Sequence, residues 1–364
     1  MAISHLKIKS LRNYKEKSFS FNKGLTVIFG KNGSGKTSIL EAIHLLSIGK
    51  SFKTNKKREL INKNKKELIL NGLFIKNDIE TTISMSIHKK EKQKIKINNK
   101  NIFTRKDLLN KNNVVVLSPE EQKITKGPAK ERRVFFDKLF SICSKKYLKN
   151  IQDYNRVLKQ RNSLLKTNIK NNKNNLEPWD DLLIKKGINL WTQKNKKFNE
   201  FKNLFLKTTQ DYNSNTKISL NYKEIKIDKT TYKNKIKANK ERDFLLKRTT
   251  FGPHLDDVLF LWNNKNIKTY GSEGENKTLL VILKLSELKY IKNTTGQQPI
   301  LLLDDLFATI DLKRSKKVIS MLKKLKQDKD DLIQTIITTT DLLNLEKTDL
   351  NFKSTKEETI ELRR

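Results

Sequence analysis

Eight consecutive residues near the N-terminus form the pattern G-x-x-x-x-G-K-[ST]. Glycines at these positions let the backbone wrap closely around phosphate groups, and the amide N–H groups of such a loop supply positive potential. The lysine reaches the β- and γ-phosphates of a nucleotide, and the final hydroxyl group ligates magnesium. The pattern predicts a site for ATP and Mg2+ with Lys36 as a catalytic residue and Thr37 as a metal ligand; the whole loop is Gly30, Lys31, Asn32, Gly33, Ser34, Gly35, Lys36 and Thr37.

Two adjacent carboxylates follow a short apolar segment late in the chain. Residues Ile300–Leu303 predict a buried strand, and Asp304 and Asp305 come directly after it. The carboxyl end of such a strand is the ligand-binding edge of an open α/β sheet. We expect Asp304 to hold the magnesium ion and Asp305 to orient or activate the attacking water, so both are predicted to be catalytic. An apolar run that ends in acid is common by itself, and the phosphate-binding loop is what makes this one informative.

A Ser-x-Gly turn is the third candidate. Ser272 and Gly274 stand at the start of a predicted helix, where a hydroxyl group and free amide N–H groups can bind an anion. Ser272 followed by Glu275 is also an ordinary capping box, which satisfies the helix N-terminus without any ligand. The turn by itself therefore leaves both interpretations open.

These residues require strands and helices that position them. Alternating polar and apolar runs in the N-terminal third predict an antiparallel sheet with one solvated face. Strand, helix and strand in succession, with all-apolar strands, indicate a parallel α/β sheet in the C-terminal part. The predicted strands are 3–9, 17–21, 24–29, 68–75, 79–87, 94–98, 114–117, 257–262, 300–303 and 333–338, and the helices beside them are 37–47, 275–291 and 312–325.

The middle of the chain has a different character. From about residue 129 to 212, apolar residues recur at helical spacing with almost no Gly or Pro. A break rich in Asn and Lys, 168–175, separates two helical stretches and predicts an antiparallel helix pair. Between Lys145 and Lys240 there are roughly 24 basic and 8 acidic residues. We therefore expect a basic, mainly helical lobe at 126–245, inserted between the two halves of a head domain, 1–125 and 246–364.

Composition narrows the class of protein. With 78 Lys+Arg and 39 Asp+Glu the formal charge is +39, which favours nucleic acid as a partner, although AT-rich codon usage also enriches Lys, Asn and Ile. A single cysteine, Cys143, cannot form an internal disulfide and suits a reducing compartment. No apolar stretch approaches the roughly 20 residues of a membrane span, and the N-terminus does not look like a signal peptide. We expect a cytoplasmic protein without a membrane partner.

Together, the three motifs resemble the ATP-binding-cassette ATPases. Lys36 and Ser272 are 236 residues apart, and no histidine follows the Asp304–Asp305 strand, where transporter cassettes carry one. Further segments resemble the RecF family of DNA replication and repair proteins along the whole chain: 11–14 (LRNY), 117–120 (LSPE), 131–133 (ERR), 159–162 (KQRN), 178–180 (PWD) and 251–254 (FGPH). This resemblance implies an α/β ABC-ATPase fold (Rad50/SMC-head-like), that is, a P-loop domain with an inserted helical lobe.

The resemblance also implies roles for further residues. Arg12 and Asn13 would lie near the nucleotide, and Ser272 and Gly274 would be the signature residues that complete the ATP site of a second subunit. Residues Ala308–Asp311 resemble the loop that crosses the dimer after the acidic strand end. Glu273 and Glu275 depart from the family, which carries Gln at both places, and two carboxylates near a γ-phosphate would repel it unless they point elsewhere.

The implied activity is that of a slow, DNA-stimulated ATPase in recombinational repair, replication restart and the SOS response. An ATP-dependent homodimer would hold DNA at gaps or junctions between single and double strands without reading sequence, hydrolysis would release it, and RecO and RecR would cooperate in loading RecA. Two alternatives belong to other classes: a transporter or translation-associated cassette ATPase, and a DNA-binding scaffold whose ATP site is vestigial.

Overall fold

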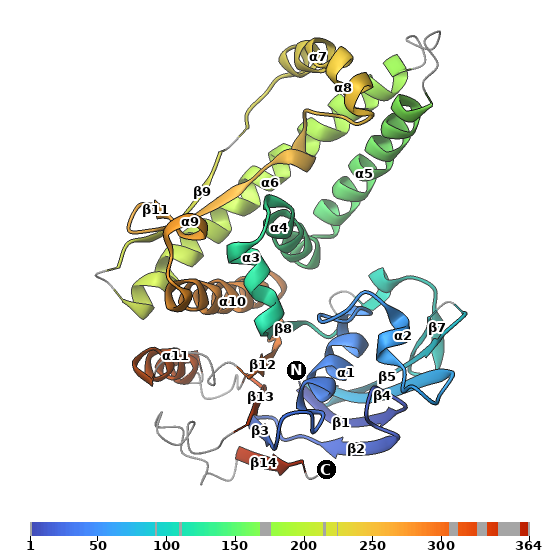
Figure 1. Ribbon diagram of the computed structural model, residues 1–364, viewed down its shortest axis with the longest axis vertical. Coiled ribbons are helices and arrows are strands. Elements are labelled where there is room, and N and C mark those ends of the chain that lie inside the picture. Colours follow the sequence, from blue (N-terminus) through green and yellow to red (C-terminus); the bar gives the residue numbers. More distant parts are fainter. Residues whose placement is uncertain are drawn as a thin grey trace. The chain divides into compact units, whose positions relative to one another are not determined.

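The chain divides into two compact units in the computed structural model (Figure 1). The head unit comprises Met1–Gln122, Thr208–Ser214 and Ser272–Arg364, and the lobe unit comprises Lys123–Lys207 and Asn215–Gly271. The structure describes residues 2–91, 93–108, 111–167, 176–213, 216–223, 225–305, 312–325, 333–340 and 357–362. Within those ranges, no helix combines the length and the apolar character that crossing a membrane requires.

A six-stranded antiparallel sheet forms one part of the head unit, in the order β2-β1-β4-β5-β6-β7. Its inner residues alternate with outer ones, as the sequence predicted, and pack with helix α1 (Lys36–Ile48) in one apolar core that includes Leu6, Ile43 and Leu70. The strand bounds are β1 Ala2–Lys9, β2 Glu16–Ser20, β4 Glu67–Lys76, β5 Ile79–His88, β6 Lys94–Ile97 and β7 Lys100–Ile102.

A five-stranded parallel sheet forms the other part, in the order β14-β3-β13-β12-β8. Strands β8, β12 and β13 are buried along their whole length, which explains the apolar runs Val114–Leu117 of β8 and Ile300–Leu303 of β12. Because all five strands run the same way, β3, β8, β12 and β13 end at one edge, where ligands bind in open α/β sheets. The bounds are β3 Leu25–Phe29, β8 Val114–Leu117, β12 Ile300–Asp304, β13 Thr335–Thr339 and β14 Glu357–Glu361.

Strand β14 was not predicted from the sequence. Its residues are mostly charged, and it joins the sheet only by pairing with β3 over five residue pairs, Glu357 to Glu361. The remaining head elements are α2 Lys57–Leu60, η1 Arg105–Leu108, η2 Pro119–Gln122, α10 Glu273–Thr295 and α11 Leu312–Leu325. The α/β fold of the head unit therefore matches the predicted fold class.

Two long antiparallel helices dominate the lobe unit (Figure 1). They are joined side by side by ion pairs, Arg161 with Asp180 at 2.6 Å and Lys186 with Asp153 at 2.7 Å. The lobe elements are α3 Lys123–Lys126, α4 Ala129–Cys143, α5 Lys145–Lys166, α6 Glu177–Tyr212 (its last turn belongs to the head unit), β9 Ile218–Tyr222, α7 Lys229–Ala238, α8 Lys240–Leu246, η4 Pro253–Leu255, β10 Val258–Trp262, β11 Lys265–Asn266 and α9 Ile267–Tyr270.

The lobe is longer at its C-terminal end than the predicted boundary at residue 245. It continues to Gly271 because β10 pairs with β9 over five residue pairs, forming a three-stranded sheet with β11. Arg132 of α4 also binds Asp257 through two hydrogen bonds of 2.8 and 2.9 Å. These contacts between distant segments assign 246–271 to the lobe, where the sequence had placed it in the head.

Candidate nucleotide-binding site

The loop between β3 and α1 has the backbone shape that its glycines permit. Gly30, Gly33 and Gly35 have φ values of 151°, 78° and 101°, a region that side chains rarely adopt. A Cβ atom on Gly35 would lie 2.7 Å from the hydroxyl oxygen of Tyr14, and one on Gly30 would lie 2.6 Å from the carbonyl oxygen of Leu362. The loop is therefore held from two sides, by β14 and by the segment that follows β1.

Lys36 is the first residue of α1, and its side chain folds back over this loop. Its ammonium group donates hydrogen bonds to the carbonyl oxygens of Gly30 at 2.7 Å and Lys31 at 3.0 Å. Burial lowers the pKa of Lys36, while the nearby carboxylates Asp305 and Asp304 partly oppose that shift. The charge of Lys36 thus lies at the centre of the loop, where a phosphate group would meet it.

Asp304 ends β12 and is almost fully buried, with 4% of its surface exposed. It accepts hydrogen bonds from the hydroxyl groups of Thr37 at 2.9 Å and Thr338 at 2.7 Å. Burial raises the pKa of Asp304, and the two hydroxyl groups limit the rise because they stabilise the ionised form. The two predicted magnesium ligands, Thr37 and Asp304, therefore lie within hydrogen-bonding distance of each other.

The donor set suits Mg2+, which binds through one or two protein oxygens and keeps phosphate and water as its other ligands. Among the residues that the structure describes, no cluster of three or more His, Cys, Asp or Glu side chains could hold a metal ion. A magnesium ion at Thr37 and Asp304 would accordingly complete its shell with nucleotide phosphates and water.

Asp305 is held in an uncommon backbone conformation with φ of 48°. Its amide N–H donates to the backbone oxygen of Thr338 at 3.2 Å and to the Thr338 hydroxyl at 3.1 Å. One carboxylate oxygen, Oδ1, is buried without a hydrogen-bond partner. A buried acceptor of this kind requires a donor, such as an ordered water molecule, which fits the predicted role of Asp305 in orienting water.

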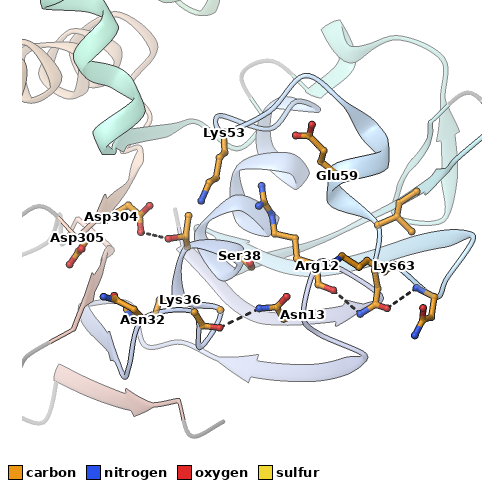
Figure 2. Close-up of a pocket in the computed structure, with 16 residues that line it drawn as sticks. Arg12, Asn13, Asn32, Lys36, Ser38, Lys53, Glu59, Lys63, Asp304 and Asp305 are labelled. Atoms are coloured by element: carbon orange, nitrogen blue, oxygen red, sulfur yellow. Dashed lines mark hydrogen bonds between the residues drawn. The ribbon is translucent and has the colours of Figure 1, made fainter.

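These side chains line one cavity of about 670 Å3 in the head unit (Figure 2). It contains predicted residues from the loop, both carboxylates, and Arg12 and Asn13. It also contains residues that no sequence motif identified, which come mainly from the segment around α2: Ser38, Lys53, Glu59, Ile61, Asn62, Lys63 and Asn64. That segment has no recognisable pattern, and only the fold brings it to the loop.

Arg12 is anchored by a buried carboxylate. It has φ of 48°, and its guanidinium group donates to Glu41 at 2.6 Å and 2.9 Å. Glu41 lies on α1 with its side chain fully buried. Asn13 donates to the carbonyl oxygen of Gly33 at 3.3 Å, and Asn62 donates to the carbonyl oxygen of Arg12 at 2.6 Å. Arg12 and Asn13 thus belong to the wall of the cavity and help to hold the phosphate-binding loop.

The Ser-x-Gly turn does not line this cavity. Ser272 caps α10 in a reciprocal capping box with Glu275, with bonds of 2.8 and 3.2 Å, and Glu273 pairs with Lys277 at 3.2 Å. Glu273 and Glu275, the two residues that depart from the family pattern, therefore each have a local partner on their own helix. Gly274 is packed so closely that an added Cβ would meet the Arg314 guanidinium group, and Ala308–Asp311 lie outside the described residues.

Helix α10 is tied to the end of β8 by a buried lysine. Lys284 pairs with Glu121 at 3.0 Å and with Glu287 at 2.5 Å, and its side chain is 4% exposed. Burial by itself lowers the pKa of Lys284, but the two carboxylates outweigh this effect and raise it above the ordinary value. These ion pairs fix helix α10 against the parallel sheet, which carries Asp304 and Asp305 at the end of β12.

The comparisons with known proteins all identify the same family. Residues 2–361 match the RecF/RecN/SMC N terminal domain family. The DNA replication and repair protein RecF of Alkaliphilus oremlandii is 35% identical over 351 residues, covering 93% of each chain. The RecF protein of Clostridioides difficile is 35% identical over 340 residues, covering 90% of each.

Solved structures agree with the sequence relatives. The structure of the recombination mediator protein RecF-ATP in the RecFOR pathway superposes with a TM-score of 0.84 at 30% identity, covering 93% of this chain and 92% of that one. The corresponding RecF-ATPrS structure gives a TM-score of 0.83 at 28% identity, covering 100% and 96%. An Smc head structure with 19% identity and a TM-score of 0.55 shares the fold.

Proposed function

The chain belongs to the RecF family of DNA replication and repair proteins, whose fold is that of the ABC/SMC-type ATPases, and from this premise we propose that it is an ATP-driven DNA clamp of recombinational repair. The single observation that carries the proposal is the cavity that joins the phosphate-binding loop to the acidic end of β12. The relatives named as RecF-ATP and RecF-ATPrS support ATP as its ligand.

Different residues of the cavity bind the phosphates, hold the metal ion and orient the attacking water. The amide groups of Gly33–Thr37 and the ammonium group of Lys36 bind the phosphates. Thr37 and Asp304 hold Mg2+, which neutralises charge on the phosphates when bound. Asp305, with its unpartnered buried oxygen, orients the attacking water. We expect hydrolysis to be slow, so that ATP serves as a conformational switch.

A second copy of the chain completes the site. Ser272 and Gly274 begin a helix of 23 residues whose N-terminus favours anions, yet neither residue lines the cavity of its own chain. We assign them to the nucleotide of a partner subunit in an ATP-dependent homodimer, as the family resemblance implies. Glu273 and Glu275 do not obstruct this role because each is engaged on its own helix.

DNA is the partner that the charge distribution favours. The lobe segment between Lys145 and Lys240 carries roughly 24 basic and 8 acidic residues, and it lacks a motif that would read bases. The closed dimer holds DNA at gaps or junctions, DNA stimulates hydrolysis, and hydrolysis opens the clamp. We also propose cooperation with RecO and RecR in loading RecA; the solved relatives are named as recombination mediator proteins of the RecFOR pathway, which supports the first two partners.

The test compares Lys36→Met with the wild-type chain by light scattering and by DNA affinity, each with and without Mg2+ and ATP. Wild-type chain should become dimeric and bind gapped DNA more tightly with ATP, and Lys36→Met should do neither. Lys50→Met, an exposed lysine two residues after α1, is the matched control and should behave as wild type. Identical DNA affinity with and without ATP in the wild-type chain would overturn the switch.

A second variant separates binding from hydrolysis. Asp305→Asn keeps the size of the side chain but removes the charge that orients water. It should dimerise with ATP and retain DNA while its turnover falls at least tenfold. A wild-type chain that shows no turnover even with gapped DNA would instead identify a scaffold with a vestigial site.

A further inference from the structure

Phe103 is the most exposed large hydrophobic residue among those that the structure describes, at 95%. It follows β7 directly, and β7 is the edge strand of the six-stranded sheet (Figure 1). Leaving a whole aromatic ring in water sacrifices the free energy that its burial would supply, which is large for this side chain. A single exposed hydrophobic residue is common on a protein surface, so the residues around the ring decide what it could contact.

The register of the sheet places lysines beside this ring. Ile95 pairs with Ile102, and Lys96 pairs with Asn101. Phe103 comes one residue after the last pair of this ladder, next to the β6 segment that carries Lys94 and Lys96. These two lysines lie on the outer face of the sheet, since the alternate residue Ile95 is buried in the core and Lys94 and Lys96 are exposed.

These lysines are available to an incoming anion. Lys96 makes no ion pair with any residue in the described part of the chain. Lys94 pairs only with Glu91 at 3.2 Å, and both side chains are more than half exposed. An exposed pair of this kind contributes little stability, so a phosphate group can displace the carboxylate.

We propose that the β6–β7 edge, made of Lys94, Lys96 and Phe103, binds single-stranded nucleic acid. The ammonium groups contact backbone phosphates, and the Phe103 ring stacks on an unpaired base. A single ring among lysines is too small an apolar surface for a protein interface, whereas a base offers a flat partner of matching size and its phosphates offer the opposite charge. A duplex keeps its bases stacked and would leave the ring without a partner.

This inference rests on the proposed function, because it assigns a new contact surface for the same DNA. Stacking of one base on an aromatic residue corresponds to a loss of about 5-fold to 150-fold in affinity when the residue becomes alanine. One phosphate contact through a lysine contributes about 0.7 to the slope of log K against log salt for single strands. The two kinds of contact therefore leave separate signatures.

The experiment measures binding of fluorescent oligothymidylate and of a blunt duplex to the full chain with ATP and Mg2+. Phe103→Ala should weaken oligothymidylate binding at least fivefold and leave duplex binding unchanged, and Phe103→Tyr should restore it. Lys96→Gln should lower the salt slope by about 0.7. The matched controls are Ile79→Ala, whose side chain is 70% exposed on β5, and Lys76→Gln at the end of β4.

The outcomes separate the two claims. If the wild-type chain binds DNA and Phe103→Ala matches Ile79→Ala, the β6–β7 edge is not a nucleic-acid surface and the proposed function stands. Equal weakening on oligothymidylate and duplex would overturn the single-strand assignment. If the wild-type chain binds neither DNA, the proposed function itself fails.

Discussion

The hydroxyl group of Thr338 links the carboxylate of Asp304 to the backbone amide of Asp305 in the candidate site. It donates to Asp304 at 2.7 Å and accepts from the amide of Asp305 at 3.1 Å, and Thr338 is fully buried. Thr338→Val keeps the shape of the side chain and removes only this hydroxyl group. The substitution therefore isolates the hydrogen bonds without opening a cavity.

The size of the effect follows from the charge on Asp304. A hydrogen bond to an ionised group contributes about 1.5–3 kcal/mol, and leaving part of a buried carboxylate unsatisfied adds to the loss. The amide of Asp305 keeps its bond to the backbone oxygen of Thr338, so its share is small. We expect Thr338→Val to reduce the free energy of unfolding of the head unit by about 2 kcal/mol at pH 8.

The matched control is Thr26→Val on β3. Thr26 is also fully buried, but its hydroxyl group has no hydrogen-bond partner, so its removal should leave stability unchanged or increase it. All three tryptophans, Trp179, Trp191 and Trp262, belong to the lobe unit. Urea unfolding of the head unit should therefore be followed by hydrogen exchange at β12 and β13 and not by tryptophan fluorescence.

The pH dependence provides the second check. Burial raises the pKa of Asp304, so the folded state binds this proton more tightly than the unfolded state, and stability falls as pH rises through the folded pKa. The Thr338 hydroxyl group lowers that pKa, and its loss should raise the pKa further. The difference between Thr338→Val and wild type should be full at pH 8 and shrink as pH falls and Asp304 becomes protonated.

Equal destabilisation in Thr338→Val and Thr26→Val would refute the assigned role of the Thr338 hydroxyl group, because both variants would then report a general intolerance of valine. A difference that stays constant as pH falls from 8 to the ordinary pKa of aspartate, about 3.9, would refute it as well. If the expected pH dependence is observed, Thr338→Val should also bind Mg2+-ATP more weakly than wild type, because Asp304 would be ionised less readily.

Three further predictions concern other parts of the chain. Gly35→Ala should weaken ATP binding at least tenfold by calorimetry, because its φ of 101° and its close contacts exclude a side chain, whereas Gly296→Ala, with φ of 65° and open space, should not. Arg161→Met should destabilise the lobe unit by about 3–5 kcal/mol in tryptophan-monitored unfolding, because it leaves the fully buried carboxylate Asp243 unpaired. Lys284→Met should destabilise the head unit by a similar amount. The stability that the wild-type ion pairs contribute should be constant up to about pH 10.4 and be lost as pH rises through the raised pKa of Lys284.

Each has an outcome that would contradict it. ATP affinity unchanged in Gly35→Ala would mean that the loop relaxes on binding. An unfolding midpoint of Arg161→Met within error of wild type would show that water reaches Asp243. For Lys284→Met, a destabilisation that persists undiminished above pH 11 would exclude the ion pairs as its source, since above about pH 10.4 the unfolded wild-type chain loses the lysine proton that the folded chain keeps, and the stability that comes from the raised pKa falls.

Local patterns predicted much of the fold because the pattern of apolar residues within a strand or helix reflects how that element is buried. Strand β8 was predicted at its observed bounds, since Val114–Leu117 is apolar and buried on both faces. Helix α11 was likewise predicted as Leu312–Leu325. Strand β14 was missed because its stability comes from hydrogen bonds to β3 and not from its charged side chains.

The lobe boundary illustrates the same limit. The sequence around residue 245 changes from helical to strand-like, which suggested a return to the head. The strand formed there, β10, pairs with β9 of the lobe, and no local pattern reveals which distant strand is chosen.

The sequence alone determined the chemistry at the centre of the site: the phosphate-binding loop and the carboxylates Asp304 and Asp305, because both are short contiguous motifs whose residue types imply their ligand. Only the tertiary structure decided that Thr338 links the Asp304 carboxylate to the Asp305 amide, that Lys53 and Lys63 line the cavity, and that Phe103 is exposed beside lysines. Each of these depends on pairing between segments far apart in the chain, and such pairing is selected by the packing of the whole unit.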